Sequence, residues 1–335
     1  MYTEPTRIYQ TSEWLAGRGS GIGGEEQGLN TGASNWLRRL AAALGVLIVL
    51  ADLSCSSAPA PRDKSTPPWK QVWADNFDGQ ADGGVNTRLW NFESGRGIFG
   101  TGEIETMTSS RFNAQLDGHG NLKLIVLGHG AAGSPDAAWT SARIRTRSTF
   151  VPPAGGEMMV TASIKQPSPA SPMGYWPGFW MLAPSGWPAT GEIDIMENVN
   201  GLSKTSGTLH CGNLNQDNSD GTFGPCHEKS GLGSGLQTCA GCGQGFHTYS
   251  VIVDRRVAGH EQIRWYLDGH QFYSLSEDQI GQAAWTAGVD SGKSILLNVS
   301  IGGAFPDAQC RCTTPDAQTS SQGTMTIQYV KVFKN

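Results

Sequence analysis

From Trp69 onward the hydrophobic positions fall in short runs of about 6 to 9 residues, with no long stretch at helical spacing. Aliphatic, β-branched and aromatic residues fill these runs, and Gly, Pro, Asn and Asp separate them, which is typical of strands joined by turns. The Asp268-Gly269 pair between two of the runs is a hairpin signal. The predicted strands cover residues 121–127, 141–146, 158–165, 248–254, 262–267, 295–301 and 325–333.

This succession of strands predicts the fold class. Many short strands without helices between them form a sandwich or a barrel rather than a parallel α/β sheet. No internal repeat is visible, which disfavours a propeller. We therefore expect residues 69–335 to form one all-β catalytic or binding domain.

The first 68 residues have a different pattern, which predicts export. Residues 1–35 are a polar, Gly-rich N-terminal extension. Within residues 36–54 an Arg pair precedes twelve apolar or small residues, a pattern typical of a signal peptide and too short for a membrane span. Residues 55–68 are a Pro/Ser-rich tether. We expect soluble secretion, with a lipoprotein anchored at Cys55 or a twin-arginine signal as alternatives.

Composition narrows the class of partner. The 335 residues include 38% hydrophobic and 16% charged positions, eleven Trp, and a net charge of −5. Nucleic-acid binding needs a basic surface, so the negative charge argues against that class. Few charges, many turns and many Trp fit an all-β protein that handles neutral sugars. We expect a monomer that needs no cofactor.

Cysteine usage also fits an exported protein. Beyond the tether there are six Cys residues, an even number that indicates disulfides and allows fifteen pairings. Cys239 and Cys242 are expected to close a local loop, and a half zinc site or a redox pair is the alternative. The spacing of Cys310 and Cys312 is tight, so at least one of them is expected to pair elsewhere.

The most informative segment carries three acids, Glu192, Asp194 and Glu197. Glu192 and Asp194 share one face of a strand, and one extra residue, a β-bulge near Ile195 or Met196, would bring Glu197 to the same face. Mutual repulsion then raises at least one pKa, as a general acid near neutral pH requires. A retaining glycosidase needs two such carboxyl groups about 5–5.5 Å apart. A solvated acidic face and a metal site are the alternatives.

Aromatic residues precede the acids. Trp176 and Trp180 share a strand face, and Trp187 lies between this strand and the acids in the sequence. Indole faces stack on the apolar side of sugar rings, so these three are predicted to line a carbohydrate cleft. Phe179 and Met181 point the other way and are predicted to be core.

The acids and the Trp segment together resemble glycoside hydrolase family 16, in its laminarinase-like branch. The resemblance implies a β-jelly-roll sandwich with a concave carbohydrate-binding cleft. It also implies that Glu192 is the nucleophile, Asp194 an assisting acid and Glu197 the acid/base, with retention of configuration. The extra Met196 is similar to the bulged form common in 1,3-β-glucanases. Weaker similarity covers most of 71–333, in segments 73–77, 90–93, 140–143, 207–210, 265–269 and 297–303.

The resemblance extends to further site residues. It implies that His210 lies near the acid/base on the leaving-group side, and that Asn91 and Arg143 bind sugar in the other half of the cleft. Members of the family often bind a structural calcium through acids, where this chain has Asn76 and Gln328. Both residues are neutral, so a calcium site is disfavoured.

The function implied by the resemblance is that of an endo-acting β-glucanase that cuts β-1,3 linkages in laminarin-like glucan. Specificity lies in loops, so a mixed-linkage (1,3-1,4)-β-glucanase or an agarase is the alternative within the family. A non-catalytic β-glucan-binding protein is the alternative from another class, and the presence of both Glu residues disfavours it. The Cys-rich loop 211–246 is expected to shape the leaving-group half of the cleft.

Overall fold

The computed structural model describes residues 68–97, 100–129 and 138–335. The predicted N-terminal extension, the signal segment and the tether with Cys55, up to residue 67, lie outside the described residues. Within the described ranges, no helix has both the length and the apolar character needed to cross a membrane.

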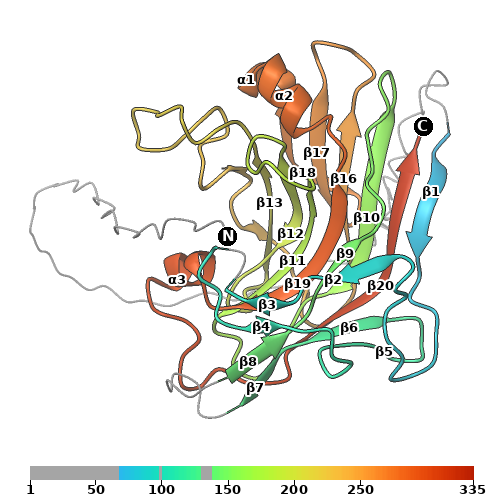
Figure 1. The fold of residues 1–335 in the computed structure, drawn as a ribbon, viewed down its shortest axis with the longest axis vertical. Coiled ribbons are helices and arrows are strands. Elements are labelled where there is room, and N and C mark those ends of the chain that lie inside the picture. Colours follow the sequence, from blue (N-terminus) through green and yellow to red (C-terminus); the bar gives the residue numbers. More distant parts are fainter. Residues whose placement is uncertain (1–67, 98–99, 130–137) are drawn as a thin grey trace, which may run out of the picture. The chain divides into compact units, whose positions relative to one another are not determined.

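Most strands belong to two antiparallel sheets that pack face to face (Figure 1). Sheet A has the order β18-β17-β16-β10-β20-β6-β5, and β1 pairs with one part of the long β20. Its strands are β1 (Lys70–Asp75), β5 (Ala114–Leu116), β6 (Leu122–Ile125), β10 (Glu157–Lys165), β16 (His247–Asp254), β17 (Gln262–Leu267), β18 (His270–Ser276) and β20 (Thr324–Lys334).

Sheet B carries the acids. Its order is β14-β13-β12-β11-β19-β9-β2, and β15 also pairs with β13. Its strands are β2 (Trp90–Phe92), β9 (Arg143–Thr146), β11 (Tyr175–Leu182), β12 (Glu192–Glu197), β13 (Lys204–His210), β14 (Leu232–Gly233), β15 (Gln237–Thr238) and β19 (Ser294–Ile301). A small third sheet has the order β3 (Gly95–Arg96), β4 (Thr106–Met107), β8 (Ala138–Ser141) and β7 (Leu127–His129).

The predicted all-β sandwich is confirmed, and each predicted run contains a strand. Two runs hold more than one strand because the chain changes sheets inside them. Residues 121–127 pass from β6 in sheet A to β7 in the small sheet at Val126, and residues 141–146 pass from β8 to β9 in sheet B at Ala142. Such breaks are the corners at which strands of a sandwich switch layers.

The expectation that no helices separate the strands is wrong in three places. Helices α1 (Glu277–Ile280) and α2 (Gln282–Gly288) precede β19, and α3 (Ala304–Cys310) precedes β20. Each has four to seven residues. Helices of two turns or fewer are too short to show a helical period in the sequence.

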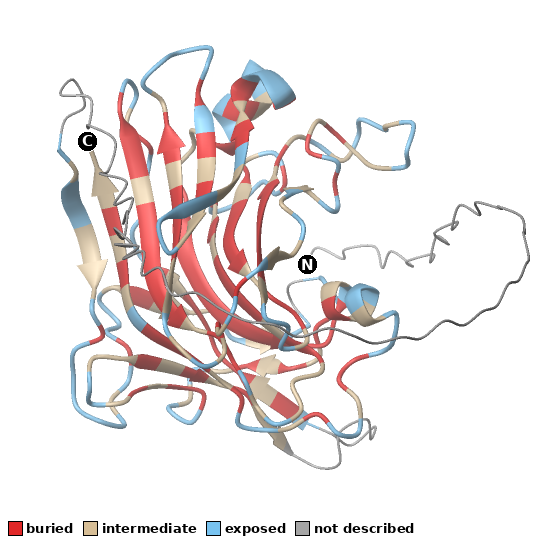
Figure 2. Cartoon of the chain, turned by 180° about the vertical axis from the view of Figure 1, so that it is seen from behind, coloured by how far each residue is buried: buried red, intermediate tan, exposed pale blue. Residues whose placement is uncertain are grey.

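One hydrophobic cluster fills the space between the two sheets. Buried residues run along the central strands of both sheets, with exposed residues concentrated in loops and at the edge strand β1 (Figure 2). Phe179 and Met181 belong to this core, as predicted. Strand β12 contributes its apolar residues to the core, so its acids face the other side of sheet B.

Among the described residues, three disulfides join Cys211 to Cys226, Cys239 to Cys242 and Cys310 to Cys312. The predicted local bridge at 239–242 is confirmed, whereas the expectation that Cys310 or Cys312 pairs elsewhere is wrong. Arg311, at the end of α3, takes a left-handed conformation and reverses the chain. The two Cα atoms are therefore only 5.2 Å apart, within the usual range for a disulfide.

Candidate active site

Strand β12 contains the β-bulge that the sequence predicts. Asp194 pairs with Thr208 and Glu197 with Ser206, so three steps along β12 match two steps along β13. The register with β11 shifts in the same place. The extra residue cancels the odd spacing between Asp194 and Glu197, because side chains alternate between faces along a strand. All three acids therefore lie on the face of sheet B that points away from the core.

The acids lie close to Trp176 and His210. The indole Nε1 of Trp176 donates a 2.8 Å hydrogen bond to Glu197 Oε1. The Nε2 atom of His210 lies 3.5 Å from Asp194 Oδ2. One polar atom each from Glu192, Asp194 and His210 lie within 4.8 Å of one another. The structure thus brings together the three predicted acids, His210 and Trp176.

Burial changes the acidity of all three carboxyl groups. Desolvation, with repulsion from Glu197, raises the pKa of Glu192 to about 7, although the positive charge of His210 opposes this rise. Burial and the neighbouring carboxylates raise the pKa of Asp194 well above its usual range. Burial also raises the pKa of Glu197, partly offset by the hydrogen bond from Trp176. The cluster therefore retains protons near neutral pH, as general acid catalysis requires.

Glu228 is a site residue that the sequence analysis missed. Its side chain is fully buried, and its two oxygens accept the backbone N–H of Cys211 at 2.9 Å and bind His210 Nδ1 at 2.8 Å. This contact orients the imidazole so that Nε2 faces Asp194. Glu228 lies 18 residues beyond His210, inside the Cys-rich loop, and no local pattern marks it.

The three predicted cleft tryptophans differ in exposure. Trp187 lies in the loop between β11 and β12, is 42% exposed, and has its ring centre 5.8 Å from that of His210. Trp176 and Trp180 are half-buried on β11. The Nε1 atom of Trp180 donates to Asn298 Oδ1 at 2.7 Å, which fixes its ring. Aromatic surface is thus present on both sides of the acids.

Arg143 and Asn91 lie towards the opposite edge of sheet B. The Arg143 guanidinium sits 4.6 Å from the ring centre of Trp180, and its Nε donates to Glu93 Oε2 at 2.6 Å. Glu93 also binds Arg145 at 3.1 Å, and Asn91 pairs with Arg145 in the register of the sheet. Asn91 is four strands away from β12, so it shares the face but not the acid cluster. Sequence analysis missed Glu93, although it lies two residues after Asn91.

Two groups of residues bear on whether the site holds a metal ion. Glu192, Asp194 and His210 have a spacing that could hold a cation, in line with the metal alternative. The family's calcium positions offer Asn76 and Gln328, and the Gln328 amide oxygen already accepts a 2.6 Å hydrogen bond from a serine hydroxyl of β10. Without a carboxylate, these two residues do not fit a calcium site.

Comparison with known proteins agrees with this architecture. Residues 120–244 match the family described as "XgeA-like, catalytic GH16 domain". The crystal structure of an endo-1,3-β-glucanase from Streptomyces sioyaensis is 40% identical, has a TM-score of 0.71, and the match covers 83% of this chain and 99% of that one. Glucan endo-1,3-β-glucosidase A1 from Niallia circulans is 29% identical over 301 residues, 83% of this chain. A β-glucanase from Rhodothermus marinus is 27% identical over 313 residues, 89% of this chain and 95% of the relative.

A jelly-roll sandwich with clustered carboxyl groups and indole rings on one sheet defines a class, the β-sandwich glycoside hydrolases. The chain belongs to glycoside hydrolase family 16. It spans 40% of the length of the Niallia circulans relative.

Proposed function

We propose that this chain is a retaining endo-β-glucanase that hydrolyses β-1,3-glucosidic bonds in laminarin-like glucan. The observation that carries the proposal is the bulge in β12, which places Glu192, Asp194 and Glu197 on one face beside His210 and Trp176. The relatives named above as endo-1,3-β-glucanases support the choice of linkage.

In the first step the Glu192 carboxylate attacks the anomeric carbon, while Glu197 donates its proton to the leaving glycosidic oxygen. The carbon–oxygen bond breaks, and the sugar remains bound to Glu192 as an ester. Burial raises the pKa of Glu192 to about 7, and the charges of His210 and Arg143 oppose that rise and favour the carboxylate form that attacks. Burial raises the pKa of Glu197, which favours the protonated form that a general acid needs.

In the second step Glu197, now a carboxylate, takes a proton from water as the water oxygen attacks the anomeric carbon. The bond to Glu192 breaks, and both carboxyl groups return to their starting states. Two inversions give net retention. Asp194 lies between the two Glu residues in sequence, and its Oδ2 is 3.5 Å from His210 Nε2.

The test is product analysis of the full chain on laminarin, mixed-linkage glucan and agarose in parallel. We expect a ladder of short oligosaccharides from laminarin and weak action on the other two. Cleavage of mixed-linkage glucan or agarose alone would reject the β-1,3 assignment. A curated relative named endo-1,3(4)-β-glucanase makes mixed-linkage glucan a necessary control, and agarose tests the agarase alternative. Binding of glucan without cleavage would favour the non-catalytic alternative.

Replacement of each catalytic Glu by Gln tests the roles. Glu197→Gln removes the proton donor and should lower kcat by about 10²–10⁴-fold. Glu192→Gln removes the nucleophile and should cost at least as much. Both variants should keep the thermal unfolding transition of the wild type, and near-full activity of either one contradicts the assignment. Unchanged activity in EDTA is expected, and its loss would favour the metal alternative for Glu192, Asp194 and His210.

We also propose that the chain is exported. Three disulfides support an oxidising compartment. Mass spectrometry of the mature protein should show removal of the residues before the tether. An acyl mass on Cys55, lost in Cys55→Ser, would identify a lipoprotein instead of a soluble enzyme.

A further inference from the structure

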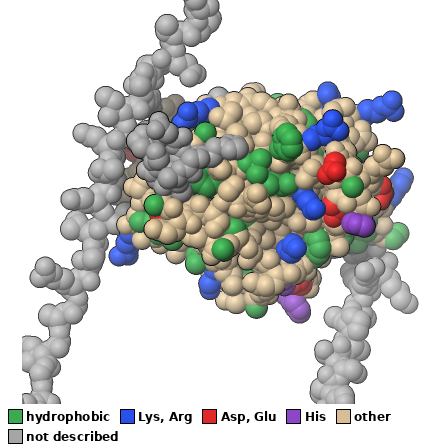
Figure 3. Space-filling view, turned by 90° about the horizontal axis from the view of Figure 1, so that it is seen from below, with side chains coloured by type: hydrophobic (Ala, Val, Ile, Leu, Met, Phe, Trp, Pro, Cys, Tyr) green, Lys and Arg blue, Asp and Glu red, His purple; other side chains and the backbone are tan. Residues whose placement is uncertain are grey.

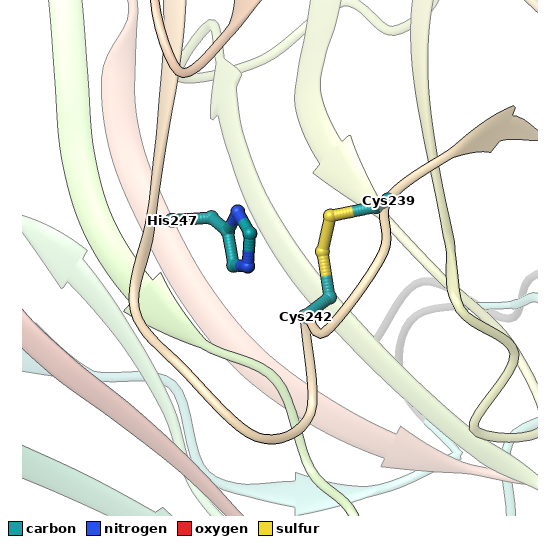
Figure 4. A group of neighbouring side chains, drawn as sticks. All are labelled: Cys239, Cys242 and His247. Carbon is teal, nitrogen blue, oxygen red and sulfur yellow. A yellow bond between two sulfur atoms is a disulfide. The ribbon is translucent and has the colours of Figure 1, made fainter.

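Cys239, Cys242 and His247 converge at the start of β16 (Figure 4). We propose that, when the Cys239–Cys242 disulfide is reduced, these three side chains bind a thiophilic divalent metal ion such as Zn²⁺. The same residues would thus have two mutually exclusive states, a disulfide and a Cys₂His metal site. This inference does not depend on the proposed glucanase activity.

The ligand atoms are already close to one another. One atom each from Cys239, Cys242 and His247 lie within 4.8 Å of one another. Both Cys residues are buried, with exposures of 1% and 0%. Cysteine thiolates and imidazole are the ligands that zinc prefers, and two Cys separated by two residues are a frequent half of such a site. Little movement of the chain is needed to place a metal ion between them.

The imidazole of His247 is held in the orientation that a metal ligand needs. Its Nδ1 lies 2.7 Å from Asp268 Oδ2, while the other oxygen of Asp268 accepts the backbone N–H of Thr248 at 2.8 Å. With Nδ1 donating to the carboxylate, Nε2 is left as the ligand atom. That Nε2 faces the turn between the two Cys residues, 3.8 Å from where a Cβ on Gly241 would lie. A carboxylate behind the imidazole is the usual outer partner of a metal-bound histidine.

The sulfur atoms also have a suitable hydrogen-bond donor. The Tyr249 hydroxyl lies 2.9 Å from Cys242 Sγ and 3.6 Å from Cys239 Sγ. This hydroxyl accepts a hydrogen bond from Gln166 Nε2 at 3.0 Å, so its own proton is available to a sulfur. A donor aimed at sulfur stabilises a metal-bound thiolate.

The disulfide is converted into the metal site in two steps, reduction and then metal binding. A dithiol reductant transfers two electrons and two protons to the Cys239–Cys242 disulfide and becomes a disulfide itself. The metal ion then displaces the proton of each thiol and binds both sulfurs and the Nε2 lone pair, and water completes the coordination. Reoxidation requires release of the metal ion.

The experiment measures metal binding by the full chain after reduction with a phosphine, which avoids a competing dithiol. Titration with Co²⁺, followed by thiolate-to-metal charge-transfer absorption, should show one tight site, and Zn²⁺ should displace the Co²⁺. The oxidised protein should show no such absorption. Absence of this absorption in the reduced protein would overturn the proposal.

Variants separate this site from the other cysteines. Cys239→Ser/Cys242→Ser and His247→Gln should abolish tight binding, and Asp268→Asn should weaken it about 10–100-fold. Cys310→Ser/Cys312→Ser, which removes another closely spaced pair, is the matched control and should bind as the wild type does. Retained affinity in His247→Gln or in Cys239→Ser/Cys242→Ser would contradict the assignment. Circular dichroism verifies that each variant is folded.

Discussion

At the scale of single residues, the outstanding feature of the site is how its ionisable groups are held. Glu228 binds the Nδ1 atom of His210, and the Nε2 atom of the same ring faces Asp194. The indole N–H of Trp176 donates a hydrogen bond to Glu197. Burial alone would lower the pKa of His210, but the hydrogen bond to Glu228 and the nearby carboxylates outweigh it and raise that pKa. Glu228 is therefore a positioning residue that also favours the charged imidazole.

Glu228→Gln should lower the pKa of His210, because the amide can still accept the Nδ1 proton but carries no charge. NMR titration of the histidine side chains measures this directly. Glu93→Gln, which changes a carboxylate at the opposite edge of sheet B, is the control and should leave the His210 titration where it is. An unchanged His210 titration in Glu228→Gln would contradict the electrostatic role. A fall in kcat with the altered titration is the expected functional result.

A second buried carboxyl group, Glu105, makes stability depend on pH. Its Oε2 accepts the backbone N–H of Ile301 at 2.8 Å, its Oε1 has no hydrogen-bond partner among the described residues, and burial raises its pKa from 4.5 to about 7. Because the folded pKa is the higher one, the contribution of Glu105 to the free energy of unfolding is full below pH 4.5. It is lost as the pH rises through 7.

Glu105→Gln should therefore gain stability relative to the wild type as the pH rises. The amide oxygen can still accept the N–H of Ile301, and it does not ionise. We expect the difference in the free energy of unfolding to shift in favour of the variant by about 1–3 kcal/mol between pH 5 and pH 8. Denaturant unfolding at the two pH values measures it, and an equal difference at both pH values would rule out this account.

At the scale of elements, strand β12 is positioned at its start by a close backbone contact. Gly191, which precedes β12, has φ +80°, and a Cβ there would overlap the carbonyl oxygen of Gly288 at the end of α2. The Ser291 hydroxyl also donates to the carbonyl of Thr190 at 2.9 Å. The short helix α2 thus fixes the point at which strand β12 begins.

Gly191→Ala should be strongly destabilising. Gly259 is a matched control, because it has φ +79° but nothing within 4 Å of a Cβ. Gly259→Ala should cost about 1–2 kcal/mol for the backbone conformation alone. Gly191→Ala should cost about 1–3 kcal/mol more, because of the overlap. Chemical denaturation of both variants measures the difference, and equal costs would show that α2 does not constrain β12.

The strands are the part of the structure that the sequence predicted best. The short runs of aliphatic, β-branched and aromatic residues located the long strands, and the spacing of the acids required a bulge that the register confirms. Glu228 and Glu93 were missed because their roles arise from contacts 18 and 50 residues away in sequence, which the fold creates. The pairing of Cys310 with Cys312 was misjudged because the turn at Arg311 is visible only in the backbone.

At the scale of the molecule, two broad sheets carry the core and the disulfides close only short loops. On the face in Figure 3, charged side chains are scattered among uncharged atoms, in keeping with a charged content of 16%. The disulfides span 15, 3 and 2 residues along the chain. They therefore restrict the unfolded chain much less than links across the sandwich would.

Paired Cys→Ser replacements should follow the order of loop length. Loss of the Cys211–Cys226 link should lower the free energy of unfolding by about 3 kcal/mol, and loss of either shorter link by about 1–2 kcal/mol. Equilibrium unfolding of the three double variants provides the comparison. A larger cost for Cys310→Ser/Cys312→Ser than for Cys211→Ser/Cys226→Ser would contradict the loop-length argument.

The bulge in β12 has a consequence for how such sites diverge. Inside an ordinary strand, gain or loss of one residue sends every later side chain to the opposite face. Between Asp194 and Glu197 the chain already accommodates one surplus residue while β13 keeps its register on both sides. A single-codon deletion there would leave Glu192, Asp194 and the last Glu on a common face. Sequence motifs whose acids are spaced with or without this extra residue can therefore form the same site. A motif search that fixes the spacing would separate relatives that have the same arrangement of acids.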